Sequence, residues 1–153
     1  MKEQFIKWAE DNGWDVFEVE DKADLPDHIK KRYIIPEKWY DFIARIRVCQ
    51  NRDWTKWFLT PSGYKNDRNE GFRWNEYEIQ SLEWCDGDPQ IVAYWEKHLP
   101  IFMSVEDEYS YYAIDITNGN VVYGCEPEYE EATIVADDFN AFIGKIISGE
   151  IVL

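Results

Sequence analysis

The chain has 153 residues, of which 45% are hydrophobic, and this suits one domain with a sizeable core rather than a disordered protein. Its formal net charge of −15 disfavours binding to nucleic acid or to an anionic membrane surface, and no apolar run approaches the roughly 20 residues of a membrane span. The N-terminal residues lack the apolar stretch of a secretion signal, and the three cysteines are isolated, which favours a cytoplasmic protein without disulfides.

The first part of the chain carries apolar side chains at helical spacing. Residues 1–12 have an apolar stripe that ends at Gly13, and residues 27–33 suit a short helical turn. Pro36 then precedes a third apolar face that extends to Ile46, and proline is favoured in the first turn of a helix. The sequence therefore predicts helices in these three places.

The middle of the chain is more mixed. Residues 54–60 are rich in aromatic and β-branched side chains, which predicts a strand followed by a turn at Pro61. A polar loop is expected over residues 63–71. Residues 72–82 fit either a short strand or the start of a helix, and residues 90–98 carry a helical apolar face.

Two apolar runs, residues 99–105 and 109–116, flank three acids and predict two strands joined by a turn. Asn118-Gly119 then predicts a two-residue hairpin turn, because both residues tolerate positive φ. Counting outward from this turn separates the two faces of the hairpin. The pairs expected on the buried face are Ile116–Val121, Ile114–Tyr123 and Tyr112–Cys125. The pairs expected on the other, partly exposed face are Asp115–Val122, Ala113–Gly124 and Tyr111–Glu126.

The last residues predict a short strand over 133–136 and a terminal helix near 137–148 that ends at Gly149. Helices at both ends with antiparallel strands between them indicate the α+β class. We expect a single domain over residues 1–153, with a mainly antiparallel sheet whose terminal helices pack on one face. The other face of the sheet is expected to be more open.

The sequence gives little sign of catalysis. It has no glycine-rich phosphate loop, no nucleophile elbow and no cysteine–histidine spacing typical of zinc. His28 and His98 are far apart and are interpreted as structural, and the three cysteines as small buried apolar residues. Residues 86–88 (Asp-Gly-Asp) fit a plain turn better than a cation site. We therefore expect a protein that is not an enzyme and has no metal or cofactor.

The charge is distributed unevenly along the chain. Residues 1–73 hold fourteen basic and fourteen acidic residues, whereas residues 74–153 hold seventeen acids and only Lys97 and Lys145. Such a field attracts basic partners, although acidic residues also serve solubility alone. Both interpretations remain open on charge alone.

Several segments, in order, resemble the SUKH superfamily, a group of mostly bacterial immunity proteins that includes a fungal regulator of cell-wall synthesis. They are "IIPEKWYDFIARI", "GFRWNEYEIQSLEW", "YWEKHLPIFMSVEDEYSYYAIDITNGNVVYG" and "EPEYEEATIVADDFNAFIGKI". Together they span most of the chain after Tyr33. The chain departs from the family after the proline-led helix, where "RVCQNRDWTKW" replaces the usual Asn-Gly turn.

The resemblance implies an immunity protein that binds and neutralises a cognate protein toxin, often a nuclease or another toxin that acts on nucleic acid. Such a toxin needs a basic cleft to attract phosphate, and carboxylates interleaved with aromatics would complement it. The alternative is a non-enzymatic regulatory or scaffold protein that binds another cellular partner. The oligomeric state is left open.

The expected binding surface combines two acidic segments at one end of the hairpin with the tyrosines between them. Its members are Glu106, Asp107, Glu108, Tyr109, Tyr111, Glu126, Glu128, Tyr129 and Glu130. The competing interpretation is that acids gather in turns because turns are exposed to water, and that the tyrosines only cover the sheet. In that case we expect the interface around Trp54, Trp57 and Trp84.

Overall fold

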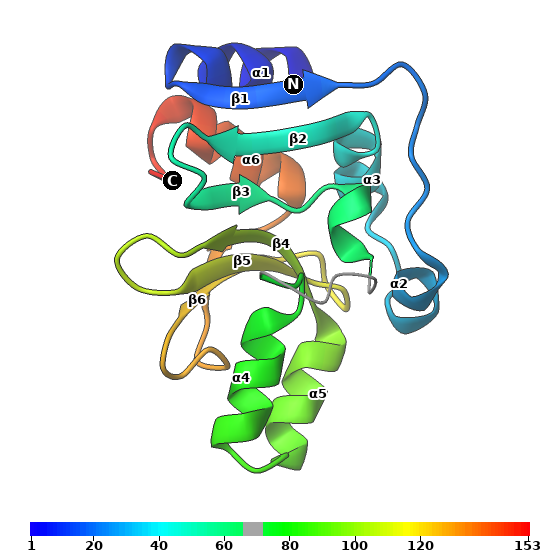
Figure 1. Ribbon diagram of the computed structural model, residues 1–153, viewed down its shortest axis with the longest axis vertical. Coiled ribbons are helices and arrows are strands. Elements are labelled where there is room, and N and C mark those ends of the chain that lie inside the picture. The colour runs from blue at the N-terminus through cyan, green and yellow to red at the C-terminus, as the bar shows by residue number, and fades with distance from the viewer. Residues whose placement is uncertain (66–71) are drawn as a thin grey trace.

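The computed structural model describes residues 1–65 and 72–153, and within them a seven-stranded antiparallel sheet carries helices on both faces (Figure 1). The predicted α+β class is confirmed. In chain order the elements are α1 (Lys2–Asp11), β1 (Trp14–Glu18), α2 (Asp27–Arg32), α3 (Glu37–Ile43), β2 (Ile46–Asn51), β3 (Lys56–Phe58), a 3-10 turn (Pro61–Tyr64), α4 (Glu76–Trp84), α5 (Pro89–Lys97), β4 (His98–Ser104), β5 (Ser110–Asp115), β6 (Val121–Cys125), β7 (Thr133–Ala136) and α6 (Phe139–Ser148).

Each strand of the sheet pairs with the next one along the chain, in the order β1 to β7. The sequence did not predict β1 or β2, and the helix expected to extend to Ile46 ends at Ile43 instead. Ile46 opens β2, where it is buried against the core. The strand expected over residues 54–60 shortens to Lys56–Phe58 because Trp54 has a φ of 59° and lies in the turn before it. Most of the polar loop expected over 63–71 lies outside the described residues.

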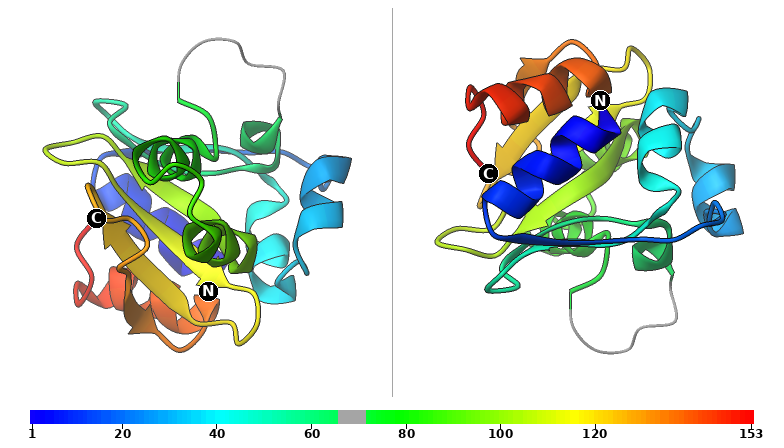
Figure 2. Two further views of the ribbon diagram at one scale, coloured as in Figure 1. Left: turned by 90° about the horizontal axis from the view of Figure 1, so that it is seen from below. Right: turned by 90° about the horizontal axis from the view of Figure 1, so that it is seen from above.

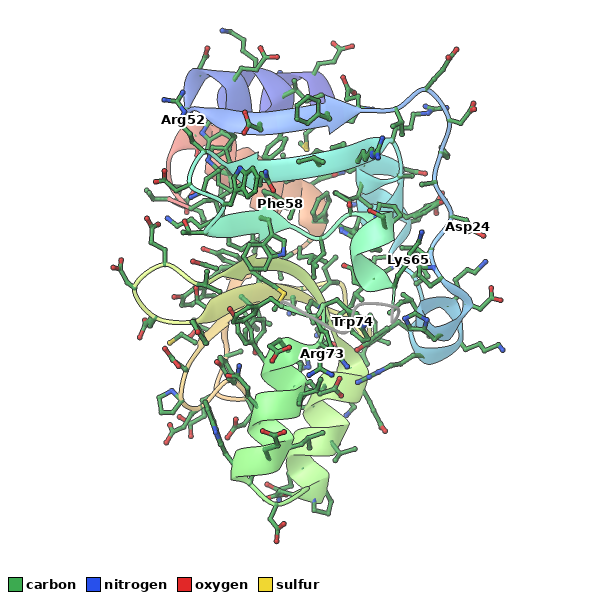
Figure 3. The ribbon with its side chains drawn as sticks, in the orientation of Figure 1. Asp24, Arg52, Phe58, Lys65, Arg73 and Trp74 are labelled. Atoms are coloured by element: carbon green, nitrogen blue, oxygen red, sulfur yellow. The ribbon has the colours of Figure 1, made fainter. Side chains whose placement is uncertain are left out.

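Helices α1, α3 and α6 cover one side of the sheet, which we call the inner face (Figure 2). Its core is a chain of aromatic rings. Phe5 of α1 meets Phe58 of β3 at 5.4 Å between ring centroids, and Phe58, labelled in Figure 3, meets Phe102 of β4 at 5.1 Å. Phe102 then contacts Tyr112 of β5, which packs at 4.9 Å on Phe142 of α6. The terminal helices therefore share one face, as expected.

The opposite side, the outer face, is covered over β4 to β6 by the α4–α5 helix pair (Figure 2). Residues 76–84 form α4, which resolves the ambiguity of that segment in favour of a helix. Trp95 of α5 packs on Tyr111 of β5 with centroids 5.1 Å apart, and Ala113 and Val122 beside it are buried. The expectation of a partly exposed face is therefore wrong for this part of the sheet.

The β5–β6 hairpin has the expected faces but a different register. Ile114 faces Val121 and Tyr112 faces Tyr123, a shift of two residues from the predicted pairs. The cause is the length of the loop, which has four residues (116–119) instead of the two predicted. The Gly119 N–H donates to the Asp115 carbonyl oxygen at 2.7 Å and closes this longer loop. Because a shift of two restores the same side of a strand, every residue keeps its face. Tyr112, Ile114 and Val121 are buried as predicted, whereas Ile116 and Tyr123 are only half-buried.

The terminal helix α6 is confirmed, with the Asp138 carboxylate accepting the Ala141 N–H at 2.7 Å and Gly149 at a φ of 82° after its last turn. The cysteines differ from expectation: Cys49 is buried, but Cys125 is half-buried and Cys85 is exposed. Among the helices of the described residues, none has both the length and the apolar character needed to cross a membrane.

Candidate functional site

Two acidic loops lie side by side at one end of the β5–β6 hairpin. The first, the acidic turn (Glu106, Asp107 and Glu108), joins β4 to β5, and the second, the acidic loop (residues 126–131), joins β6 to β7 (Figure 1). The Tyr109 N–H donates to the Glu126 carboxylate at 3.0 Å, and the Glu126 N–H donates to the Tyr109 carbonyl at 2.9 Å. The two acidic segments therefore lie next to each other, as the predicted hairpin requires.

Most of these acids form no ion pair with a described basic residue. Glu106 pairs with Lys56 at 2.7 Å. No described basic residue forms an ion pair with the other acidic members of the expected surface: Asp107, Glu108, Glu126, Glu128 and Glu130. The Glu128 carboxylate lies close enough to Glu131 to raise its pKa, and burial together with the neighbouring Glu108 raises the pKa of the Cys125 thiol. The described residues around the two loops therefore carry an excess of negative charge.

Two of the three tyrosines assigned to this surface are buried, which corrects the sequence prediction. Tyr111 is 1% exposed and Tyr129 is 0% exposed. Tyr111 points under the α4–α5 pair, where its hydroxyl bonds with that of Tyr94 and donates to the Tyr129 carbonyl. Because a partner cannot touch a side chain that the α4–α5 pair covers, Tyr111 and Tyr129 act as support rather than as contact residues.

Tyr129 fixes the acidic loop to α4. Its ring lies between Tyr77, at 4.7 Å, and Trp84, at 5.8 Å, and its hydroxyl donates to the Gln80 side chain at 2.9 Å. This stack gives the loop an anchor in the core. Tyr109 has an intermediate position: it is half-buried, with its ring stacked on Tyr77 at 5.9 Å.

The exposed aromatic side chains beside the acids are tryptophans. Trp84, at the last residue of α4, is 54% exposed and stacks nearly parallel on Tyr129, at an interplanar angle of 11°. On the other flank the Val105 N–H donates to the Thr55 carbonyl. Trp54, which precedes Thr55 and is 71% exposed, therefore lies beside the start of the acidic turn. Trp54 and Trp84 belong to the alternative interface expected from the sequence. Only the tertiary structure shows that both lie beside the acids and remain exposed, whereas Trp57 is half-buried.

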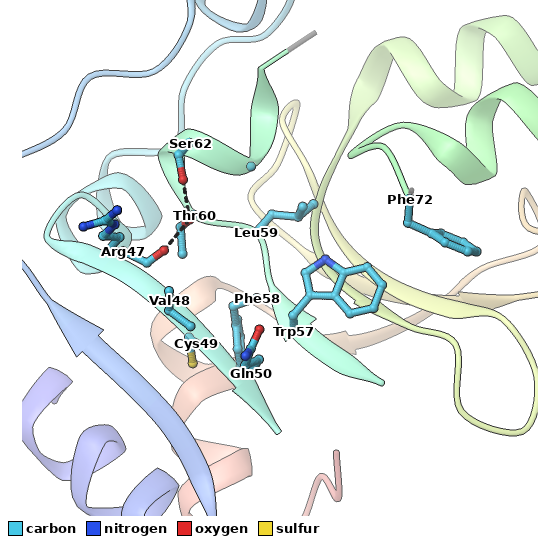
Figure 4. A pocket seen from close by; sticks show the side chains of 11 residues that line it. Arg47, Val48, Cys49, Gln50, Trp57, Phe58, Leu59, Thr60, Ser62 and Phe72 are labelled. Carbon is cyan, nitrogen blue, oxygen red and sulfur yellow. Dashed lines mark hydrogen bonds between the residues drawn. The ribbon is translucent and has the colours of Figure 1, made fainter. Parts of the chain in front are cut away.

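A separate hollow of about 320 Å³ lies over β2, β3 and the 3-10 turn (Figure 4). Trp57 and Phe72 form one wall, and Thr60 donates to the Arg47 carbonyl at 3.0 Å on the other. Arg47 is the single charged residue among the described side chains that line it. This hollow has neither the acidic character of the two loops nor a set of groups suited to catalysis.

The two histidines bond to the backbone. His28 Nε2 lies 2.7 Å from the Tyr64 carbonyl, and His98 Nδ1 lies 2.6 Å from the Tyr94 carbonyl. His98 Nε2 is 3.8 Å from Asp115, yet burial lowers the pKa of His98 overall. Among the residues that the structure describes, no three histidine, cysteine or acidic side chains lie together as metal ligands would.

The fold and the surface together define an α+β protein with an acidic face bordered by exposed tryptophans. Comparison of the chain with models of protein families, with curated proteins and with solved structures found no match.

Proposed function

We propose that this protein is an immunity protein that binds and neutralises a basic protein toxin in the cytoplasm, without catalysing a reaction itself. One observation carries the binding role: the unpaired acids of two adjoining loops lie between two exposed tryptophans. The resemblance to the SUKH superfamily supplies the biological role.

The chemistry of the surface fits a basic protein cleft. Unscreened carboxylates accelerate encounter with a positive partner, and a desolvated tryptophan supplies much of the energy that holds a complex together. A nuclease or a related toxin must attract phosphate, so its active cleft has the complementary charge. Occupying that cleft blocks access of nucleic acid.

The test of this function uses one acid from each loop. Glu108→Lys with Glu128→Lys reverses both charges while leaving Asp107, which has a φ of 60°, in a conformation that suits it. We expect co-expression of the unaltered protein to protect cells from the product of the gene directly upstream, and the double variant to lose this protection. Binding of the purified pair should weaken at least tenfold, mainly through slower association, and the difference should shrink at high salt.

The matched control reverses Glu20 and Asp21, two exposed acids in the segment after β1 that form no ion pair with a described residue. This pair changes the net charge equally but lies away from the acidic loops, so protection and binding should be retained. Equal weakening by both double variants would show that net charge alone matters. An upstream product that is harmless would contradict the immunity role and favour a scaffold or regulatory protein.

A further inference from the structure

A small pocket of about 210 Å³ opens beside the acidic turn, on the inner face of the sheet where α1 and α6 do not reach. We call it the turn pocket. Its floor is formed by the ends of β4 and β5 with Tyr123 of β6, and its wall by Val152 and Leu153. The pocket exists because Ser104 and Ser110, which face each other across the strands, are much smaller than the next facing pair, Phe102 and Tyr112.

The floor of the pocket carries two hydroxyl groups, those of Ser110 and Tyr112. Ser110 and Tyr112 are each 8% exposed, both line the pocket, and neither hydroxyl forms a hydrogen bond with a described residue. Burial raises the pKa of Tyr112 to about 12, so its hydroxyl remains neutral at physiological pH. Because neither oxygen is fully buried, both hydroxyls are open to the pocket, where each can donate a hydrogen bond to a polar guest or accept one from it.

The rim of the pocket is acidic. Glu106, Asp107 and Glu108 line it, and Lys56, the one basic residue of its lining, is already engaged by Glu106 at 2.7 Å. Two carboxylates, those of Asp107 and Glu108, therefore have no ion-pair partner among the described residues at the mouth of the pocket. An anionic guest would be repelled, and an uncharged apolar guest would leave the floor hydroxyls unpaired.

We infer that the turn pocket receives the side chain of an arginine presented by the basic partner. This rests on the proposed function and specifies one contact within it. The pocket is smaller than the cavities that hold drug-sized ligands, which suits a single side chain. A guanidinium has five donors, enough for the rim carboxylates and the floor hydroxyls together. Its flat face also stacks well on a tyrosine ring, and the rings of Tyr112 and Tyr123 lie 5.2 Å apart in the lining.

The first experiment uses N-acetyl-arginine amide as the probe and follows the backbone amide resonances of the protein by NMR. We expect saturable shifts at residues 106–112 and 123, with a dissociation constant on the order of millimolar for so small a ligand. N-acetyl-citrulline amide has nearly the same shape without the charge and should cause no saturable shift. Equal shifts with both probes, or arginine shifts confined to other residues, would overturn the inference.

Variants separate contact in the pocket from general attraction. Glu108→Gln and the double substitution Ser110→Ala with Tyr112→Phe should each weaken the probe at least about fivefold. Glu128→Gln removes an equal charge from the acidic loop, outside the pocket lining, and should weaken it less than about twofold. Amide spectra of the free variants verify that the fold is retained. If Glu128→Gln weakened binding of the probe as much as Glu108→Gln does, general attraction to negative charge would explain the binding and the pocket would not be a specific site.

A final arm identifies the source of the arginine and separates this inference from the proposed function. The Ser110→Ala, Tyr112→Phe variant should bind the upstream toxin more weakly as well as the probe. If it loses the probe but binds the toxin normally, the pocket does not receive a partner side chain and the inference is wrong. If the Glu108→Lys, Glu128→Lys variant binds the toxin normally while the unaltered protein still binds the probe, the proposed function fails, and the pocket is a guanidinium site that does not serve the toxin.

Discussion

The ring of Tyr111 lies directly across Gly124, its neighbour on β6. A Cβ atom built on Gly124 would be 2.6 Å from the Tyr111 hydroxyl oxygen, far inside contact distance. Tyr111 cannot move aside, because Trp95 packs on its ring and its hydroxyl is bonded to Tyr94 and Tyr129. The glycine therefore allows the outer-face core, and with it the support of the acidic loop, to form.

Gly124→Ala should consequently lower the free energy of unfolding by about 1–3 kcal/mol, the usual cost of an overpacked core. Gly144→Ala is the matched control: Gly144 lies inside α6 with no atom within 4 Å of an added Cβ, so alanine should stabilise the protein by up to about 1 kcal/mol. Urea unfolding of both variants measures the contrast. An unchanged Gly124→Ala protein would mean that Tyr111 does not occupy this space.

Trp84→Ala should weaken binding of the basic partner at least tenfold, because the tryptophan is the largest exposed apolar group beside the acidic loop. Loss of its stack on Tyr129 should lower the free energy of unfolding by only about 1 kcal/mol. Ile34→Ala removes a side chain that is more exposed still, in the segment between α2 and α3, which lies away from the acidic loops (Figure 1), and should leave binding unchanged. Calorimetric titration of both variants with the partner tests this expectation. Equal affinities of the Trp84→Ala and Ile34→Ala variants would refute it.

The three thiols should react in the order of their exposure. We expect a disulfide reagent to label Cys85 quickly, Cys125 slowly and Cys49 only on unfolding, because burial raises the pKa of Cys49 and lowers its thiolate fraction. Burial and the Glu108 carboxylate both raise the pKa of the Cys125 thiol and so slow its labelling. Glu108→Gln should therefore accelerate the labelling of Cys125 but not that of the other two cysteines. Mass spectrometry of the labelled peptides gives the order. Labelling of Cys49 at the rate of Cys85 in native protein would contradict the register of β2.

His98 should make the protein less stable as the pH falls below neutrality. Burial lowers its pKa from 6.5, although the Tyr94 carbonyl and Asp115 oppose the shift and Lys97 adds to it. The unfolded chain therefore takes up this proton at a higher pH than the folded chain, so protonation favours unfolding. The free energy of unfolding should decrease as the pH falls through 6.5 towards the lower folded-state pKa, and should not depend on His98 above that range.

The His98→Asn variant keeps a donor for the Tyr94 carbonyl but removes the titration. Urea unfolding of both proteins above and below pH 6.5 should show a smaller loss for the variant. An NMR titration of the His98 ring should give a midpoint below 6.5. A midpoint above that value would show that Asp115 outweighs burial and would reverse the expected pH dependence.

The local pattern of the sequence determined much of this fold. The stripe from Phe5 to Ala9, the proline before α3 and the stripe of α6 each predict a helix from residues that are neighbours in the chain. The alternation through Tyr112 and Ile114 likewise grouped the hairpin residues into the correct two faces, although the loop hydrogen bonds at Asp115 moved the pairing by two residues and the outer face is buried rather than partly exposed. β1 and β2 were missed because half of each strand faces water, which leaves too short an apolar pattern to recognise.

The composition of the proposed binding surface was decided only by tertiary structure. The sequence placed acids in two turns at one end of a hairpin, and hairpin geometry alone brings those turns together. It could not show that the α4–α5 pair buries Tyr111 and Tyr129, or that Trp84 and Trp54 remain exposed, because burial depends on which distant helix packs on which face. The turn pocket arises in the same way, since Ser104 and Ser110 make a hollow only when their strands pair and α1 and α6 stop short of them.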